Sequence, residues 1–135
     1  MLLFEVGGRL YGCGIDAVRE IIPFRACTRL PGAPSFVCGL INLRGTITTV
    51  LDLARRLEAG EVDRAEGSIV LVEHGAKTVG VGVDRVLDVQ PVASSEIEPA
   101  TGDDARGGIA QGLVHLGGDV VVLLDVRQLV KQVLL

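Results

Sequence analysis

The side chains with the greatest capacity for chemistry in this sequence are three cysteines and two histidines. Cys13, Cys27 and Cys38 lack the two-residue spacing of metal-binding pairs, and their odd number does not suit a disulfide framework. His74 and His115 have no flanking cysteine or aspartate to complete a zinc site, and both lie beside predicted turns. We therefore predict no catalytic residue, no metal site and no cofactor site.

A second candidate for chemistry is an acidic residue, Glu20, together with a basic residue, Arg44, in the first third of the chain. Arg44 precedes Gly45 at a predicted hairpin corner, where an arginine is usually solvated. Glu20 lies in an apolar segment, 18–22, that we expect to form one helical turn after an N-cap at Asp16. A bidentate guanidinium–carboxylate contact would hold this turn against the hairpin. We predict a direct, partly buried ion pair; the alternative is a solvated arginine.

The elements that must position these residues are indicated by an internal repeat. Residues 4–18 return as 72–86, and residues 39–53 return as 112–126, with matching glycines in both copies. We expect one domain over 1–135 with two similar subdomains, approximately 1–62 and 66–135, whose edge strands can be exchanged. Each half should form its own antiparallel barrel, and the two should share an interface because each alone is small.

Turn residues and short apolar runs predict the strands and helices. Glycine-containing turns separate the runs in pairs, as in β-hairpins, and no long helix is available for parallel crossovers. The sequence thus predicts an all-β protein of two small antiparallel barrels. Further expectations are a surface loop over 94–108 and short helices at 53–59 and, capped by Asp125, at 126–135.

The repeat also decides how Cys13 is interpreted. Cys13 lies between Gly12 and Gly14, and its counterpart Val81 lies between two glycines as well. A thiol that exchanges with valine behaves as a small buried apolar residue. This favours a structural role over a nucleophilic one.

Composition excludes several classes of function. The formal net charge of −4 and the absence of basic clusters argue against a nucleic-acid partner. No apolar run approaches the ~20 residues needed to cross a bilayer, and the N-terminus lacks a signal-peptide pattern. Unpaired cysteines suit a reducing compartment. We expect a cytoplasmic protein without direct membrane insertion.

Several ordered motifs resemble one known family. The segment 39–45 followed by 50–53 is similar to the signature of CheW-like domains, the coupling modules of bacterial chemotaxis. Further matches lie in the first copy at 11–12, 15–16, 18 and 20–21, and in the second at 83–84, 86 and 88–89. The resemblance extends from about Leu3 to Leu129.

The resemblance implies a fold, partners and site residues. The fold would be two SH3-like five-stranded barrels, and the protein would be an adaptor rather than an enzyme. Its partners would be the regulatory domain of the histidine kinase CheA and the cytoplasmic tip of a chemoreceptor, a methyl-accepting chemotaxis protein, in membrane-associated arrays. Glu20 and Arg44 would form the family's ion pair beside a receptor groove, and the residues lining that groove would be Val18, Gly39, Ile41, Ile69 and Val70.

Some features depart from the family pattern, and alternatives remain. Thr49 stands where the family usually has proline, and the chain begins at the first strand without the usual extension. The array served could belong to chemotaxis or to another motility or biofilm pathway. The chain could also be a CheW-like regulatory domain of a kinase or of a receiver-fused coupler. A small-ligand barrel or a cysteine-dependent enzyme is the third hypothesis.

Overall fold

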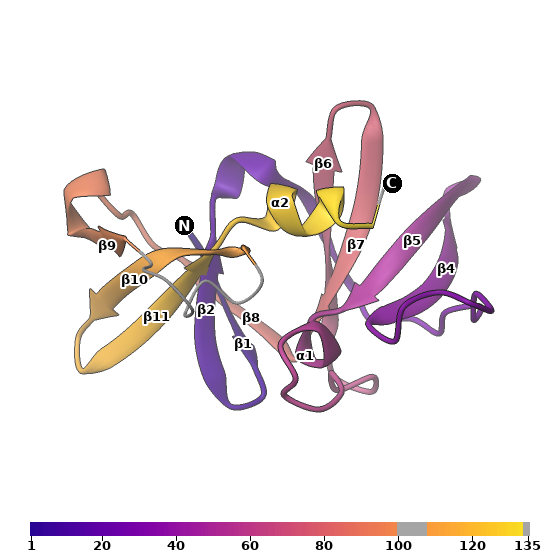
Figure 1. The fold of residues 1–135 in the computed structure, drawn as a ribbon, viewed down its shortest axis with the longest axis horizontal. Helices are drawn as coiled ribbons and strands as arrows, with labels where there is room; N and C mark the ends of the chain where they lie inside the picture. The colour runs from indigo at the N-terminus through magenta and orange to yellow at the C-terminus, as the bar shows by residue number, and fades with distance from the viewer. Residues whose placement is uncertain (100–107, 134–135) are drawn as a thin grey trace.

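The structure is a computed structural model that describes residues 1–99 and 108–133, and these residues form two β-sheets with short helices between and over them (Figure 1). The predicted all-β class is confirmed, and the architecture is consistent with two SH3-like barrels. The sheets are not purely antiparallel, because each contains one parallel pairing. These join β11 (Asp119–Leu124) to β2 (Arg9–Cys13) in one sheet and β5 (Thr46–Asp52) to β7 (Lys77–Val83) in the other.

The larger sheet has six strands and holds the N-terminal hairpin together with strands from the second half of the chain (Figure 1). Its strand order is β8 (Arg85–Val89), β1 (Leu2–Val6), β2 (Arg9–Cys13), β11 (Asp119–Leu124), β10 (Ala110–Leu116) and β9 (Ile97–Pro99).

The smaller sheet has five strands, and its central hairpin comes from the second half of the chain. Its strand order is β3 (Val18–Pro23), β6 (Ser68–His74), β7 (Lys77–Val83), β5 (Thr46–Asp52) and β4 (Val37–Leu43).

The prediction that each half forms its own barrel is therefore wrong. The β1–β2 hairpin of the first half pairs with β8 and β11, and the β6–β7 hairpin of the second half pairs with β3 and β5. More than an edge strand is exchanged, since a whole hairpin crosses in each direction. Because the copies carry the same strand pattern, the repeat alone cannot distinguish pairing within a half from pairing between halves.

The strand registers place two pairs of the repeated glycines at equivalent positions, whereas the turn glycines Gly45 and Gly118 differ, because of these two only Gly45 has a positive φ. Gly80 of β7 pairs with Val50, and its counterpart Gly12 of β2 pairs with Leu123, the residue equivalent to Val50. Both copies of the second motif also carry a β-bulge, immediately before Gly39 in β4 and before Gly112 in β10. The two sheets are thus built on one backbone plan.

The helical elements are shorter than expected. Segment 18–22 is not a helical turn, because a single 3₁₀ turn, η1 (Ile15–Ala17), leads directly into strand β3, where isoleucine and valine pair with β6. Gly14, rather than Asp16, is the N-cap of η1. The helix expected at 53–59 is the four-residue α1 (Leu53–Arg56).

The C-terminal helix is present as α2 (Val126–Lys131), and Asp125 caps it as predicted by accepting a hydrogen bond from the Gln128 N–H at 3.0 Å. Residues 134 and 135 of the predicted helix lie outside the described residues. The segment expected to be a loop over 94–108 contains a 3₁₀ turn, η2 (Ser94–Glu96), and strand β9; the rest, 100–107, lies outside the described residues.

The main hydrophobic core joins the two sheets. It contains buried residues of β1 and β2 together with those of β6 and β7, and α2 adds Val126, Leu129 and Val130. The helix α2 follows β11 of the six-stranded sheet but packs against β6 of the other sheet (Figure 1). A second cluster lies within the five-stranded sheet, and its buried members are Ile22, Ile41, Leu43, Val50, Ile69 and Leu71.

Candidate functional site

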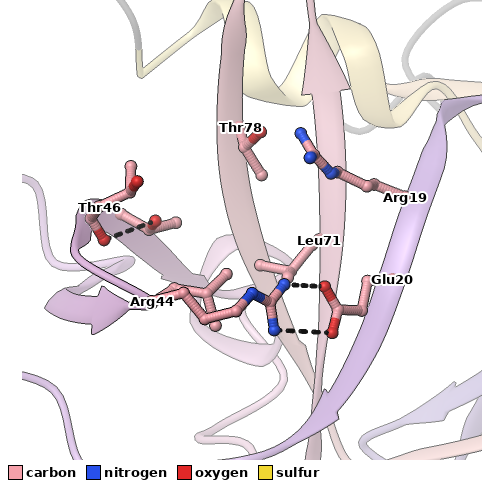
Figure 2. Close-up of a pocket in the computed structure, with 8 residues that line it drawn as sticks. Arg19, Glu20, Arg44, Thr46, Leu71 and Thr78 are labelled. Atoms are coloured by element: carbon pink, nitrogen blue, oxygen red, sulfur yellow. Dashed lines mark hydrogen bonds and ion pairs between the residues drawn. The ribbon is translucent and has the colours of Figure 1, made fainter.

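A pocket lies beside the second hydrophobic cluster, between β3, β6, β7 and the β4–β5 hairpin (Figure 2). Its volume is about 130 Å³. Leu43 and Leu71 of the second cluster belong to its lining, so the pocket reaches the apolar interior. The remaining residues of the lining are polar: Arg19, Glu20, Arg44, Thr46, Thr48 and Thr78.

Glu20 and Arg44 form the predicted ion pair across this pocket. Arg44 donates from Nη1 to Oε2 of Glu20 at 3.2 Å and from Nη2 to Oε1, so the contact is bidentate (Figure 2). The side chain of Glu20 is 33% exposed and that of Arg44 is 65% exposed. The contact is therefore confirmed, whereas the expected partial burial holds for Glu20 and not for Arg44.

The ion pair changes the protonation equilibria of both groups. The hydrogen bond from Arg44 lowers the pKa of Glu20 below its ordinary value, and the same contact raises the pKa of Arg44. Both shifts favour the charged forms. The site thus presents a fixed guanidinium–carboxylate pair to the solvent at neutral pH.

The backbone at Arg44 is in a conformation that an arginine rarely adopts. Arg44 has φ of 50° and Gly45 has φ of 86°, as in the type I′ turns that favour asparagine and glycine. Asn42 supports the turn by accepting a hydrogen bond from the Gly45 N–H at 2.8 Å. The equivalent residue of the second copy is Gly117, with φ of 59°. An arginine kept where glycine fits better indicates that its side chain has a use.

Sequence reasoning missed a second ion pair at the same pocket. Nη1 of Arg19 lies 3.0 Å from Oε1 of Glu73, and both side chains are at least half exposed. The β-bulge between Val18 and Glu20 disturbs the alternation of β3 at Arg19, and no sequence pattern reveals that bulge.

The five residues expected to line a receptor groove are mostly inside the protein. Ile41, Ile69 and Val70 are at most 4% exposed. Gly39 is also buried, and a Cβ at this position would lie 2.2 Å from the Thr28 carbonyl oxygen. Val18 alone is half-buried, at the start of β3. The structure therefore places most of these residues in the two hydrophobic clusters rather than along one open groove.

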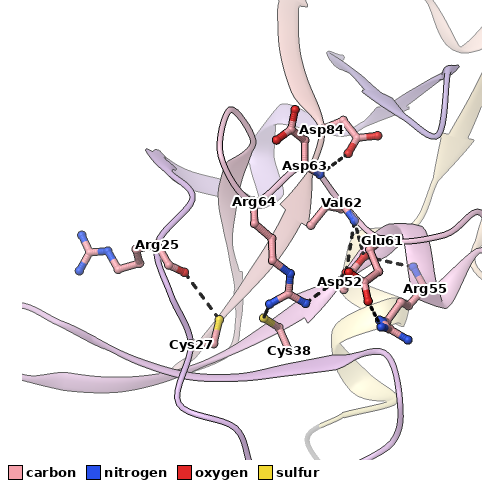
Figure 3. Close-up of polar contacts among 10 residues, drawn as sticks. All are labelled: Arg25, Cys27, Cys38, Asp52, Arg55, Glu61, Val62, Asp63, Arg64 and Asp84. Atoms are coloured by element: carbon pink, nitrogen blue, oxygen red, sulfur yellow. Dashed lines mark hydrogen bonds and ion pairs between the residues drawn. The ribbon is translucent and has the colours of Figure 1, made fainter.

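A buried aspartate organises the region between the two halves. Asp52 is fully buried and accepts hydrogen bonds from the N–H groups of Arg55, at 3.1 Å, and Val62, at 3.2 Å (Figure 3). Nη2 of Arg64 lies 3.8 Å from Oδ2 of Asp52. Asp52 thus caps α1 and holds the linker after it, which is a structural role.

The cysteines and histidines do not assemble into a metal site. Within residues 1–99 and 108–133, no group of three histidine, cysteine or acidic side chains is positioned to hold a metal ion. Cys13 is fully buried, and burial raises the pKa of its thiol to about 12. This agrees with the structural role predicted from its valine counterpart. Nε2 of His115 lies 3.2 Å from Oε1 of Glu98, and both side chains are exposed.

Comparison with known proteins decides the family. The CheW-like domain family matches residues 1–134. This chain belongs to that family. The CheW-like signature residues have visible roles, because Asp52 caps α1, Gly39 allows a close backbone approach and Arg44 forms the ion pair.

Several relatives are proteins of bacterial chemotaxis. The chain is 39% identical over 101 residues to "Chemotaxis protein CheW" of Bacillus subtilis, covering 74% of this chain and 65% of that protein. It is 33% identical to "Chemotaxis protein CheW" of Klebsiella aerogenes, with coverages of 96% and 80%. It is 31% identical to "Protein FrzA" of Myxococcus xanthus, with coverages of 95% and 82%.

A solved structure of the same family has the same fold. It is the scaffolding protein TtCheW from Thermoanaerobacter tengcongensis, which matches with a TM-score of 0.86 and 28% identity, over 95% of this chain and 84% of that chain. Within residues 1–99 and 108–133, no helix has the length and apolar composition needed to span a bilayer.

Proposed function

We propose that this CheW-like domain is a non-enzymatic adaptor that couples chemoreceptors to the histidine kinase CheA. The observation that carries the proposal is the family match, which extends over residues 1–134 and is accompanied by relatives named for chemotaxis. The adaptor is cytoplasmic and is recruited to membrane-associated receptor arrays through its partners.

The receptor-binding surface in this proposal is centred on the pocket with the Glu20–Arg44 pair. Its exposed polar groups, Arg19 and Arg44, can bind carboxylates or backbone carbonyls of a helical hairpin tip, and the apolar floor can accept one aliphatic side chain. A pocket of about 130 Å³ accepts a side chain and not a helix, so the helices would lie across its rim.

The buried residues of the predicted groove have a supporting part in this proposal. Ile41 and Ile69 belong to the second hydrophobic cluster, to which the floor residues Leu43 and Leu71 also belong. Gly39 allows the close approach of β4 to Thr28, while Val18 packs against the main core and Val70 lies within it. The kinase domain would bind a separate face, which we do not locate.

The test is a titration of receptor signalling-tip and CheA regulatory-domain fragments against the wild type and Arg44→Gly. Glycine suits the left-handed turn, so the variant should fold normally while losing the guanidinium. We expect weaker receptor binding by about tenfold, the effect of one interfacial charge pair, with kinase binding unchanged. A matched control is Arg85→Ala, which removes an exposed arginine that faces Glu5 at 3.7 Å in the other sheet.

Two outcomes would contradict the proposal in different ways. If folded wild type binds neither fragment from its own organism, the coupling function is wrong. If Arg44→Gly and Arg85→Ala bind the receptor fragment equally well, the pocket is not the receptor site. Substitutions such as Ile69→Asp are unsuitable here, because a charge at this buried position would unfold the protein.

A further inference from the structure

Two of the three cysteines lie on neighbouring segments of the first half, away from the pocket described above. Cys38 is in β4, and Cys27 precedes Thr28, which bridges to Leu40 of β4. Thr28 and Leu40 exchange two backbone hydrogen bonds of 2.8 Å, so the segments are held side by side. Both thiols are half-buried and pack against the second hydrophobic cluster.

The backbone between the two thiols is unusually close. Gly39, next to Cys38, has φ of +145°, and a Cβ there would lie 3.1 Å from Cβ of Cys27. Figure 3 shows the two sulfur atoms on the same side of the two segments, facing the Arg64 guanidinium. The backbone contacts therefore hold the two cysteines close together in the folded protein.

Arg64 supplies a positive charge to one of the two sulfurs. Its Nη1 donates to Sγ of Cys38 at 3.3 Å, its Nη2 lies 3.8 Å from Asp52, and its guanidinium stacks over the Phe24 ring at 5.8 Å. These contacts fix the guanidinium beside Cys38. A thiolate is the reactive form of cysteine, and an adjacent arginine favours it.

Cys27 has the opposite environment. The pKa of its thiol is raised to about 12, mainly by burial and next by the neighbouring Cys38, with a smaller opposing effect of Arg64. Cys27 therefore stays protonated at neutral pH. One sulfur in contact with a guanidinium and one protonated sulfur, side by side, are the two parts of a reactive dithiol.

Access to the pair comes from a surface cavity of about 660 Å³ between the 29–35 segment and the end of α1. Both cysteines belong to its lining, together with Arg29, Arg55 and Arg64, against a single acidic residue of the lining, Glu61. A small uncharged or anionic oxidant can thus reach the sulfurs from solvent.

We propose that Cys27 and Cys38 are a modification site for hydroperoxides, at which oxidation closes a reversible disulfide. The Cys38 thiolate attacks the peroxide, the O–O bond breaks, and Cys38 becomes a sulfenic acid while the alkoxide or hydroxide takes a proton from water. The Cys27 sulfur then displaces hydroxide from Cys38, and the Cys27 proton converts this hydroxide to water. The two thiols supply the two electrons that reduce the peroxide.

The test is treatment of the full chain with hydrogen peroxide, followed by blocking of free thiols and peptide mapping. We expect a Cys27–Cys38 linked peptide that dithiothreitol removes, while Cys13 stays a free thiol because it is buried. Cys27→Ser should instead accumulate a sulfenic acid at Cys38 that dimedone traps. Cys38→Ser should leave Cys27 unoxidised.

Arg64 is the positioning residue, and its effect can be measured separately. Arg64→Gln should slow alkylation of Cys38 at neutral pH by about tenfold, because the Cys38 sulfur loses the guanidinium that contacts it at 3.3 Å. Arg55→Gln is the matched control, since Arg55 lines the same cavity but pairs with Glu61. The proposal is overturned if no linked peptide forms, if Cys27 oxidises first, or if both arginine variants behave alike.

Discussion

The corresponding corners of the two sheets are formed by equivalent hairpins and differ in their charges. In the five-stranded sheet, Glu20 meets Arg44 across the pocket. The repeat places Asp88 and Gly117 at the equivalent positions of the six-stranded sheet. There Asp88 accepts hydrogen bonds from its neighbours, the Val89 N–H at 2.7 Å and the Gln90 side chain at 3.1 Å. One corner thus presents an ion pair, while the acid of the other is satisfied locally.

This difference teaches where the duplicated fold has been specialised. Bulges, turns and parallel pairings recur in both sheets, so the shared features serve folding. The arginine occurs at one corner alone, and it occupies a left-handed turn in which glycine would be relaxed. A feature that is present in one copy and unfavourable for the backbone is better explained by binding than by folding.

The two helix-capping aspartates make a second comparison, and substituting them should have the largest effect on stability. Asp52 is fully buried, accepts hydrogen bonds from two N–H groups and lies near Arg64. Asp125 is half-buried and caps α2 by accepting a hydrogen bond from the Gln128 N–H. Asp52→Ala should lower the free energy of unfolding by about 1–3 kcal/mol for each of the two backbone N–H groups that it leaves unpaired. Asp125→Ala should cost about 1 kcal/mol, as for a typical cap.

Urea denaturation of both variants measures this difference. Equal losses would show that the linker after α1 contributes nothing through Asp52. The comparison would then reduce to two equivalent caps.

The equivalent glycines Gly39 and Gly112 provide the next test. A Cβ would lie 2.2 Å from the Thr28 oxygen in one case and 2.3 Å from the Glu98 oxygen in the other. Alanine at either position must push a neighbouring segment away. Gly39 also has φ of +145°, so Gly39→Ala carries backbone strain of about 1–3 kcal/mol in addition.

We therefore expect both substitutions to destabilise the protein, Gly39→Ala by the greater amount. Thermal unfolding followed by circular dichroism is the measurement. If Gly112→Ala is the more destabilising of the two, strain at Gly39 does not matter.

The sequence predicted the all-β class and the hairpins because these depend on local signals. Turn glycines, short apolar runs and a capping aspartate act over a few residues. The ion pair followed from the resemblance together with the complementary charges. It formed although Glu20 lies in a strand and not in the helical turn that we expected.

The exchange of hairpins could not be predicted from the repeat, because both copies of the hairpin have the same strand pattern and either copy could pair with the strands of either sheet. The burial of Ile41 and Ile69 was missed for a related reason. An apolar residue in a strand looks the same whether it faces a partner or the interior, and the choice depends on which sheet closes over it. The proximity of Cys27 and Cys38 was not predicted either, because the bridge between Thr28 and Leu40 has no sequence signal.

The smallest expected effect concerns the titration of the ion pair itself. Arg44 holds the pKa of Glu20 below its ordinary value of 4.5. A carboxyl group whose pKa is lower in the folded state stabilises the protein above the unfolded pKa and loses this contribution as the pH falls through the folded pKa. Wild type should therefore be slightly more stable than Glu20→Gln above pH 4.5, and the two should converge below it. Because both side chains are partly or largely exposed, added salt should reduce the difference. Stability curves of both proteins against pH provide the measurement, and the same pair of curves in an Arg44→Gly background should coincide. A difference that persists unchanged in that background would show that Glu20 acts through another partner, and the contrast between the two corners would then rest on Arg44 alone.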